Sequence, residues 1–396
     1  MQTKKILKFR EEIRQDAFYH DLRDQVQQYL RGHGLDGFAT WQVWLKFGWY
    51  GGVCLALYFW LLFGGLPQAA ALTVWAVLGF FGVLVGLNFS HDAAHDSLSK
   101  YKLLNKVLYY LTFNALGANA YLWQMRHVQS HHLFPNVDDC DADIDDNPFI
   151  RLSPHKPLRW YHRFQYLYAP FLYLFYTLIW VFVKDFILLG KKRLANLRNI
   201  HHPAFEIALF FLAKTVYIFV MLIAPWWLGS MDWGSVWRGF LLMHFVSGYT
   251  FIFGLIASHF ADGRIFPKAD QAGYLELSWS KHQVAASLDY HATASWANWV
   301  FGGFNAHVAH HLFPQISHVH YPEISKIIGK LASKFALPYE NTTLAGAIAA
   351  HFRYLKRLGI EPATTPNTPT SKSPPEVPGQ SQDLPTYAVP NLPESG

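Results

Sequence analysis

Residues 69–90 read AAALTVWAVLGFFGVLVGLNFS, and His91-Asp92-Ala93-Ala94-His95 follows at once. The apolar run contains no charged side chain, and about 20 helical residues are enough to cross the hydrocarbon core of a membrane. A separation of four residues places two side chains on the same face of a helix. The stretch therefore predicts a transmembrane helix that delivers His91 and His95 together to one membrane surface.

Three further predominantly apolar runs, at about 45–64, 205–226 and 237–258, complete two helical hairpins. The turns within the hairpins, around residues 64–68 and 229–232, are short and contain neither Lys nor Arg. The composition agrees with a membrane protein, because only 15% of the residues are charged whereas soluble domains are nearer a quarter. We expect an all-α integral membrane protein with four transmembrane helices.

Basic residues cluster at the opposite ends of these helices, at Lys4–Arg14, Lys100–Lys106, Arg151–Arg163, Lys191–Arg198 and after Arg264. The positive-inside rule therefore places both termini and the large central segment in the cytoplasm, as a helical cap. Two aromatic-rich apolar stretches, 165–183 and 103–122, are expected to lie in the headgroup region. If 165–183 crossed instead, the histidine-rich segments on either side of it would face opposite membrane surfaces.

The two ends of the chain differ in character from its middle. Residues 1–40 are charged and polar, and predict a cytoplasmic amphipathic segment rather than a cleavable signal. The membrane domain is expected over 41–355. Residues 361–396 hold nine prolines with Ser and Thr between them, which predicts a disordered tail. The net charge of +6 fits cytoplasmic loops and lipid headgroups, and nucleic-acid binding is not expected.

Three histidine clusters carry the chemistry: His91 and His95; His127, His131 and His132; and His307, His310 and His311. Their spacings of three and four point several imidazoles in one direction, and the inferred topology puts all three clusters on the same membrane face. A single such pair is often only a packed or solvated pair of histidines. Eight beside a bilayer would be costly as neutral core residues, so the pattern predicts a metal site.

The number of histidines indicates more than one metal ion. Imidazole binds Zn, Cu, Fe and Ni alike. Zinc usually takes four ligands, so eight or nine nitrogens imply two ions. Two imidazole-rich ions at a membrane surface favour oxygen chemistry, although the spacing itself does not select iron.

At these residues the sequence resembles the membrane fatty acid desaturases, and in particular the bacterial and cyanobacterial delta-6-type (linoleoyl-type) acyl desaturases. The resemblance runs from about residue 40 to 355. Five motifs carry it: NFSHDAAHD (88–96), RHVQSHHLFP (126–135), ASHF (257–260), WANWVFGGFNAHVAHHLFP (296–314) and HVHYP (318–322).

The resemblance implies an O2-dependent enzyme that inserts a cis double bond into an acyl chain at two irons. The irons would be held by the eight histidines of the three clusters, which in this family are called the first, second and third histidine boxes. Front-end desaturases usually have Gln at the position of His307, so the position of the double bond stays open. Such enzymes also often carry a fused cytochrome domain with an HPGG motif, which His201-His202-Pro203-Ala204 does not match. Electrons are then expected from an external donor, either ferredoxin or a b-type cytochrome.

A ninth ligand is expected at His259, because it ends the fourth predicted span at the cytoplasmic face and the resembling desaturases also keep a histidine there. His291 is the rival candidate. Asp92 and Asp96 flank the first cluster, and Asp141 and Asp143 follow the second, so these carboxylates could orient ligand imidazoles. The run Asp138–Asp146 could instead be only a solvated loop. His318 and His320 are expected to be structural or to support ligands. The remaining candidates are expected on loops: His155, His162, His201, His202, His282 and His291.

Two other functions compete with desaturation. A hydroxylase of acyl, alkane or carotenoid substrates could use the same scaffold. A metal transporter would need more polar groups inside the spans than Lys214, His244 and Arg238. The expected location is a bacterial inner or thylakoid membrane, with the site on the cytoplasmic face and a membrane lipid or acyl-CoA as substrate.

Overall fold

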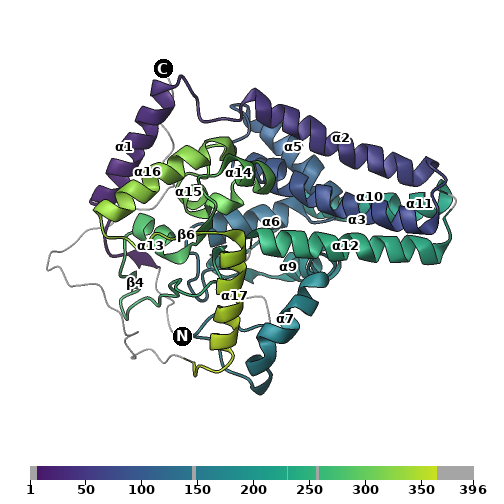
Figure 1. Ribbon diagram of the computed structural model, residues 1–396. Coiled ribbons are helices and arrows are strands. Elements are labelled where there is room, and N and C mark those ends of the chain that lie inside the picture. Colours follow the sequence, from purple (N-terminus) through teal and green to yellow (C-terminus); the bar gives the residue numbers. More distant parts are fainter. Residues whose placement is uncertain (1–6, 145–148, 230, 256–257, 364–396) are drawn as a thin grey trace. The chain divides into compact units, whose positions relative to one another are not determined.

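Long helices occupy all four segments that the hydropathy pattern selects, and they run side by side in the computed structural model (Figure 1). The structure describes residues 7–144, 149–229, 231–255 and 258–363. The predicted tail lies outside these residues from 364 onward. The first hairpin is α2 (Trp41–Phe63) and α3 (Gln68–Val85). The second is α10 (Ala204–Ile218), extended by the π-helical turn η5 (Phe219–Ile223) and α11 (Ala224–Trp227), with α12 (Trp233–Leu255).

Three of these helices are long and apolar enough to cross a membrane, namely Trp41–Phe63, Gln68–Ala94 and Ala204–Trp227. The bent pair Trp160–Leu174 and Tyr176–Gly190 could supply a fourth crossing. α12 has the length, but Arg238 and His244 lower the hydropathy of its apolar run. Three or four apolar helices in the described residues indicate membrane association.

The two stretches expected to lie on the membrane surface are not single helices. Residues 165–183 divide into α7 (Gln165–Leu174), α8 (Tyr176–Ile179) and most of the π-helical turn η4 (Trp180–Lys184), and the chain bends by 65° near Phe175 before α9 (Asp185–Gly190). Residues 103–122 divide into α5 (Lys102–Ala115) and the start of α6 (Ala120–Arg126). The break between them contains Gly117 at φ +87°, where a side chain would overlap the Tyr217 ring.

A buried ion pair fixes the start of α6 against the second hairpin. Lys214 Nζ on α10 lies 2.7 Å from Asp185 Oδ2 and also donates to the carbonyl of Gly117 at 2.6 Å. Asp185 Oδ2 in turn accepts the backbone N–H of Asn119 at 2.8 Å, and Asn119 caps α6. Lys214, a charged residue inside a predicted span, is therefore paired with a carboxylate and a carbonyl group. Through Asp185 and Asn119 it also positions α6, the helix that leads into the second histidine cluster.

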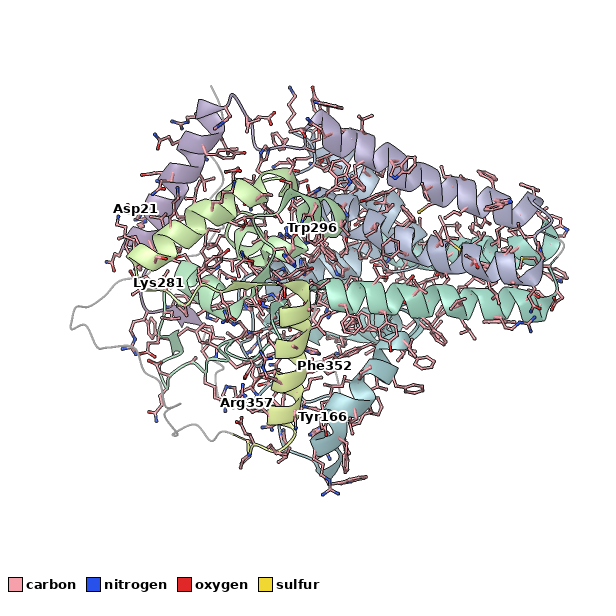
Figure 2. All side chains as sticks on the ribbon, in the orientation of Figure 1. Asp21, Tyr166, Lys281, Trp296, Phe352 and Arg357 are labelled. Atoms are coloured by element: carbon pink, nitrogen blue, oxygen red, sulfur yellow. The ribbon has the colours of Figure 1, made fainter. Side chains whose placement is uncertain are left out.

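The remaining helices pack as a cap at one end of the hairpins (Figure 1). α1 (Ala17–Gly32) buries Phe18, Leu22, Val26 and Leu30 in a core shared with α16 (Tyr321–Lys334). The other cap elements are α13 (Trp279–Ala286), α14 (Ser295–Phe301), the 3-10 turns η3 (Trp160–Phe164), η7 (Phe304–Ala306) and η8 (His318–His320), α15 (His307–Leu312) and α17 (Leu344–Leu358). α17 packs along α7, where Lys356 lies over the ring of Tyr166, whose position Figure 2 shows.

The described residues also contain six two-residue strands. The fold is therefore mainly helical, and the all-α prediction is corrected in this respect. They form three two-stranded sheets. β1 (Lys8–Phe9) pairs in parallel with β4 (Tyr274–Leu275), and β5 (Asp289–Tyr290) with β6 (Asn341–Thr342). β2 (Arg193–Leu194) and β3 (Leu197–Arg198) form an antiparallel hairpin.

We predict that Gly79→Ala destabilises the protein, because α3 and α12 meet without room for a side chain at this glycine. A methyl group there would overlap the backbone carbonyl of Met243. Overpacking of this kind costs about 1–3 kcal/mol. Small residues at helix crossings allow such close approach in membranes. Thermal unfolding of the detergent-solubilised protein should show a lower Tm.

Gly52→Ala on α2 is the matched control, because the added methyl group would meet no atom within 4 Å beyond the neighbouring backbone of its own helix, and the position is exposed. It should leave the Tm unchanged or raise it slightly, since alanine favours a helix over glycine by about 1 kcal/mol. Equal Tm values for the two variants would contradict the close contact of α3 with α12.

Candidate metal centre

All nine histidines that the sequence predicts as metal ligands lie in one buried cluster, and none is more than 7% exposed. The first cluster follows α3 through the π-helical turn η1 (Gly86–Ser90) into α4 (His91–Ala94). In the second, His127 and His131 lie on η2 (His127–His131), a π-helical turn that continues α6, and His132 follows directly after it. The third occupies α15, and His259 follows α12. The predicted convergence of the boxes is therefore present in the structure.

The nitrogens form two adjacent groups. In the first, each of His91, His95, His127 and His310 offers a ring nitrogen within 4.8 Å of the others. His132 stands beside this group, with Nε2 at 3.0 Å from His127 Nε2 and 2.9 Å from His310 Nε2. His132 is thus in contact with two members of this four-histidine group.

The second group consists of His131, His259, His307 and His311. His259 Nε2 is its centre, lying 2.7 Å from His307 Nε2 and 3.0 Å from each Nε2 of His131 and His311. His291, the rival candidate for a ninth ligand, is absent from both groups, and its ring contacts that of Trp296 in a tilted arrangement instead.

These distances fit nitrogens that share a metal ion. Two imidazoles bound at about 2.1 Å and at right angles have nitrogens about 3.0 Å apart, and in a tetrahedron about 3.4 Å. Hydrogen bonding alone does not satisfy the cluster. The Nδ1–H of His259 donates to the carbonyl oxygen of Ala286 at 3.1 Å, so a neutral His259 presents a lone pair at Nε2 to three other nitrogens. A cation can accept all of these lone pairs at once.

Burial keeps most of these rings neutral, which is the form that binds a metal. It lowers the pKa of His95 to about 4, and it lowers the pKa values of His132, His310 and His311 well below the ordinary value. His95 Nε2 has no hydrogen-bond partner among the described residues. Neutral buried imidazoles with an unpartnered nitrogen are the donor set that a transition metal requires.

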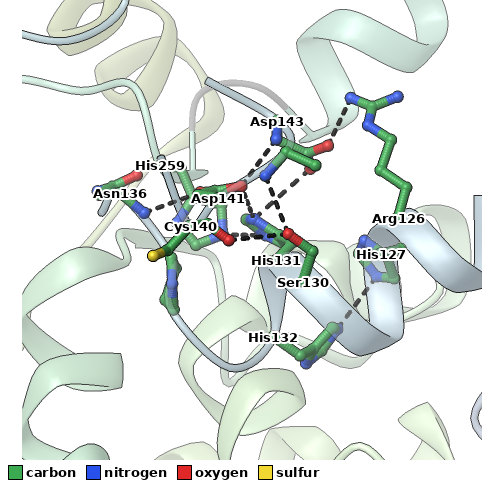
Figure 3. A network of polar contacts seen from close by, with 12 residues as sticks. Arg126, His127, Ser130, His131, His132, Asn136, Cys140, Asp141, Asp143 and His259 are labelled. Carbon is green, nitrogen blue, oxygen red and sulfur yellow. Dashed lines mark hydrogen bonds and ion pairs between the residues drawn. The ribbon is translucent and has the colours of Figure 1, made fainter. Parts of the chain in front are cut away.

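His131 differs because two carboxylates face it (Figure 3). Burial alone would lower its pKa, but Asp141 and Asp143 raise it above the ordinary value. His131 Nδ1 lies 3.0 Å from Asp141 Oδ1, while Asp141 Oδ2 accepts the backbone N–H of Asn136 at 2.8 Å. This is the carboxylate contact expected for a ligand imidazole, and it leaves His131 Nε2 directed at the second group.

Arg126 completes this network by forming an ion pair with Asp143 (Figure 3). Burial would raise the pKa of Asp143, but Arg126 holds it at about 2. Asp143 is therefore a carboxylate at neutral pH, and it lies within reach of His127 and His131 as part of a third group that could hold a cation.

Asp92 contacts a histidine outside the boxes rather than a box histidine. Its Oδ2 accepts hydrogen bonds from His318 Nδ1 at 2.8 Å and from Ser317 Oγ at 2.7 Å. The other nitrogen of His318 lies 2.9 Å from Lys46 Nζ at the start of α2. Asp92, His318 and Lys46 thus tie the first box, the segment after the third box and the first span together. Lys46 gave no signal in the sequence beyond being a charge near the start of an apolar run.

Asp289 holds the third box and was not identified from the sequence. Its Oδ1 accepts the backbone N–H of Val308 at 2.9 Å, at the start of α15, and Tyr339 donates to Oδ2 at 2.8 Å. Burial raises the pKa of Asp289 to about 7. No motif marks this aspartate, because it lies 18 residues before the box and acts through the backbone.

Several histidine and carboxylate predictions need correction. Asp96 is exposed and contacts Asn105 rather than a box histidine. His282 and His162 do not lie on loops: His282 is buried in α13, where Nε2 contacts the carbonyl of Pro135, and His162 is buried in η3. Local polarity suggested loops for both, but packing of the cap against the second box placed them inside.

The comparisons with known proteins agree with the motifs. The family model described as fatty acid desaturase matches residues 67–343. An sn-1 linoleoyl-lipid 6-desaturase of Arthrospira platensis is 32% identical over 73% of this chain and 78% of its own length. A second protein of that name, from a Synechocystis species, is 26% identical over 87% and 96%. An acyl-lipid (8-3)-desaturase of Physcomitrium patens is 28% identical over 87% and 72%.

We predict that Asp141→Asn weakens metal binding by about 10- to 100-fold, the usual cost of losing the partner that orients a ligand histidine. An amide can present its NH2 to His131 Nδ1 and so favour the wrong tautomer. The measurement is bound metal per chain, by elemental analysis, across a chelator titration. Asp96→Asn is the control, because its exposed carboxylate touches no box histidine. Equal metal retention in both variants would contradict the orienting role of Asp141.

Proposed function

Because this chain belongs to the fatty acid desaturase family, we propose that it is an acyl-lipid desaturase that inserts a cis double bond into a fatty acyl chain at a di-iron centre. The observation that carries the proposal is the pair of buried histidine groups beside apolar helices long enough to cross a membrane. A site of this kind combines a redox-capable ligand set with access to acyl chains.

The proposed ligands are the nine clustered histidines. Their distances favour an uneven division, with one ion held by His91, His95, His127, His132 and His310, and the other by His131, His259, His307 and His311. His307 stands 2.7 Å from His259 Nε2 and 3.2 Å from His311 Nε2, so it is placed to act as a ligand. Iron is preferred to zinc because the family's reaction is an oxidation.

The overall reaction converts –CH2–CH2– to –CH=CH–. O2 takes up the two hydrogens of the acyl chain together with two electrons and two protons from outside, and it leaves as two waters. When bound, the irons supply the electron and oxygen chemistry that breaks unactivated C–H bonds, which acid–base side chains cannot do. The chain contributes neutral, oriented imidazoles and a site from which bulk water is excluded, because all nine rings are buried.

We propose an acyl chain on a membrane lipid as the substrate, because the similar proteins are named for acyl-lipid and linoleoyl-lipid substrates. Each methylene moved from water into an apolar tunnel gains about 0.8 kcal/mol, but a chain drawn from the bilayer is already in an apolar environment. Recognition would therefore depend on the headgroup and on the fit of the chain. The two electrons would come from a separate donor, ferredoxin or a b-type cytochrome.

Products from a host that makes no polyunsaturated lipids would test this function. After expression with defined fatty acids, lipid analysis should show new double bonds, whereas a hydroxylase would yield hydroxylated chains. His259→Ala should abolish the product and reduce bound iron, because His259 Nε2 contacts three other proposed ligands. His291→Ala should keep both. Full activity and iron in His259→Ala would contradict the nine-histidine centre.

We further propose that the cap and its metal centre face the cytoplasm, because basic segments flank the helices on that side and the hairpin turns lack Lys and Arg. Short epitope tags inserted after Leu66 and after Asn199 would test this orientation. In intact cells only the tag after Leu66 should be accessible to antibody, and permeabilisation should expose the tag after Asn199. The reverse pattern would overturn the orientation.

A further inference from the structure

The β2–β3 hairpin brings two arginines directly opposite each other. Arg193 and Arg198 are cross-strand partners in the antiparallel register, and both side chains are exposed, as is that of Lys192. Like charges at directly opposed positions of a sheet are destabilising. Among the described residues, neither arginine forms an ion pair with a carboxylate. The arrangement has an electrostatic cost that an anion would remove.

The hairpin is fixed in place rather than loosely attached. Leu194 is buried at 3% exposure, in a small core with Leu188, Leu122 and Phe210. At the turn, Asn196 Nδ2 donates to the carbonyl oxygen of Gln129 at 2.9 Å. Gln129 lies on η2, between His127 and His131. The two guanidinium groups are thus presented outward from a rigid support.

The flanks of the hairpin place it beside the apolar surface. It follows α9, where Phe186 and Ile187 are 42% and 53% exposed, and it precedes α10, where Phe205 is 70% exposed. α10 begins one of the helices that could cross a membrane. Apolar side chains on both flanks would lie in the bilayer, which puts the charged hairpin between them at the depth of the lipid headgroups.

We propose that the β2–β3 hairpin is a binding site for anionic lipid headgroups, with Arg193 and Arg198 on either side of one phosphodiester. Guanidinium groups bind phosphate oxygens in bidentate geometry, and basic residues beside a membrane helix attract anionic lipids. The bilayer is favoured over an acidic soluble protein because the exposed side chains on both flanks of the hairpin are large and apolar. The site is separate from the metal centre and does not depend on the proposed reaction.

The test uses the purified full-length protein in neutral detergent, with its Tm followed by tryptophan fluorescence. Short-chain phosphatidylglycerol is titrated against short-chain phosphatidylcholine. The double variant Arg193→Gln/Arg198→Gln should weaken the apparent affinity for phosphatidylglycerol by roughly 30-fold, the equivalent of about 1 kcal/mol for each arginine. The variant Arg193→Lys/Arg198→Lys should retain most of the effect, which separates loss of charge from misfolding.

The matched control is Lys330→Gln/Arg353→Gln, which removes two exposed positive charges from α16 and α17. It should bind phosphatidylglycerol like the wild type. The proposal is overturned if the arginine-to-glutamine variant binds phosphatidylglycerol as tightly as the control, or if inorganic phosphate stabilises the wild type as well as the lipid does. It is also overturned if that variant keeps lipid binding but loses reduction by an acidic [2Fe–2S] ferredoxin, which would make the hairpin a donor surface.

Discussion

Buried imidazole lone pairs that face one another impose the constraint on which the rest of this structure depends. Four or five such nitrogens repel one another unless a cation lies among them, so the fold must hold them together at its own cost. Two of the rings are oriented by a hydrogen bond at the nitrogen that faces away from the cluster. Asp141 provides it for His131, and the carbonyl of Ala286 provides it for His259. The backbone of the third box is held in the same way by Asp289.

Both the membrane helices and the cap hold the histidines in position. The first box continues directly from α3, and α6, which leads into the second box, is anchored through Asn119 and Asp185 to Lys214 on α10. Lys46 reaches from α2 to His318, which holds Asp92 inside the first box. Each of these charged groups lies at or near a membrane helix, where an unpaired charge would be expensive. Their pairing makes the spans part of the site's support.

The sequence predicts the histidine cluster well because spacing encodes it. Helical periods of three and four residues are visible in the boxes, and the long apolar runs predict the helices that deliver them. His259 is recognisable because it ends an apolar run beside a known motif. The supporting residues are harder to foresee. Asp289 acts through a backbone N–H, and His318 rather than a box histidine contacts Asp92, so both depend on tertiary contacts. The 65° bend near Phe175 also leaves no periodic signal, because apolar residues continue through it.

The π-helical turns at Gly86–Ser90 and His127–His131 have a consequence for how such chains can change. A π turn contains one residue more than the α turn it replaces, so it rotates everything after it by about 100° relative to a regular helix. The lipid-facing side of α3 and the inward-facing side of the first box are thereby set independently. Losing one residue here would turn His91 and His95 away from their partners while leaving the hydrophobic length of the span almost unaltered. Insertions and deletions should therefore be excluded between residues 85 and 95 and tolerated in the hairpin turn at 64–67. Selection would then act here on the length of the chain rather than on the identity of any single side chain.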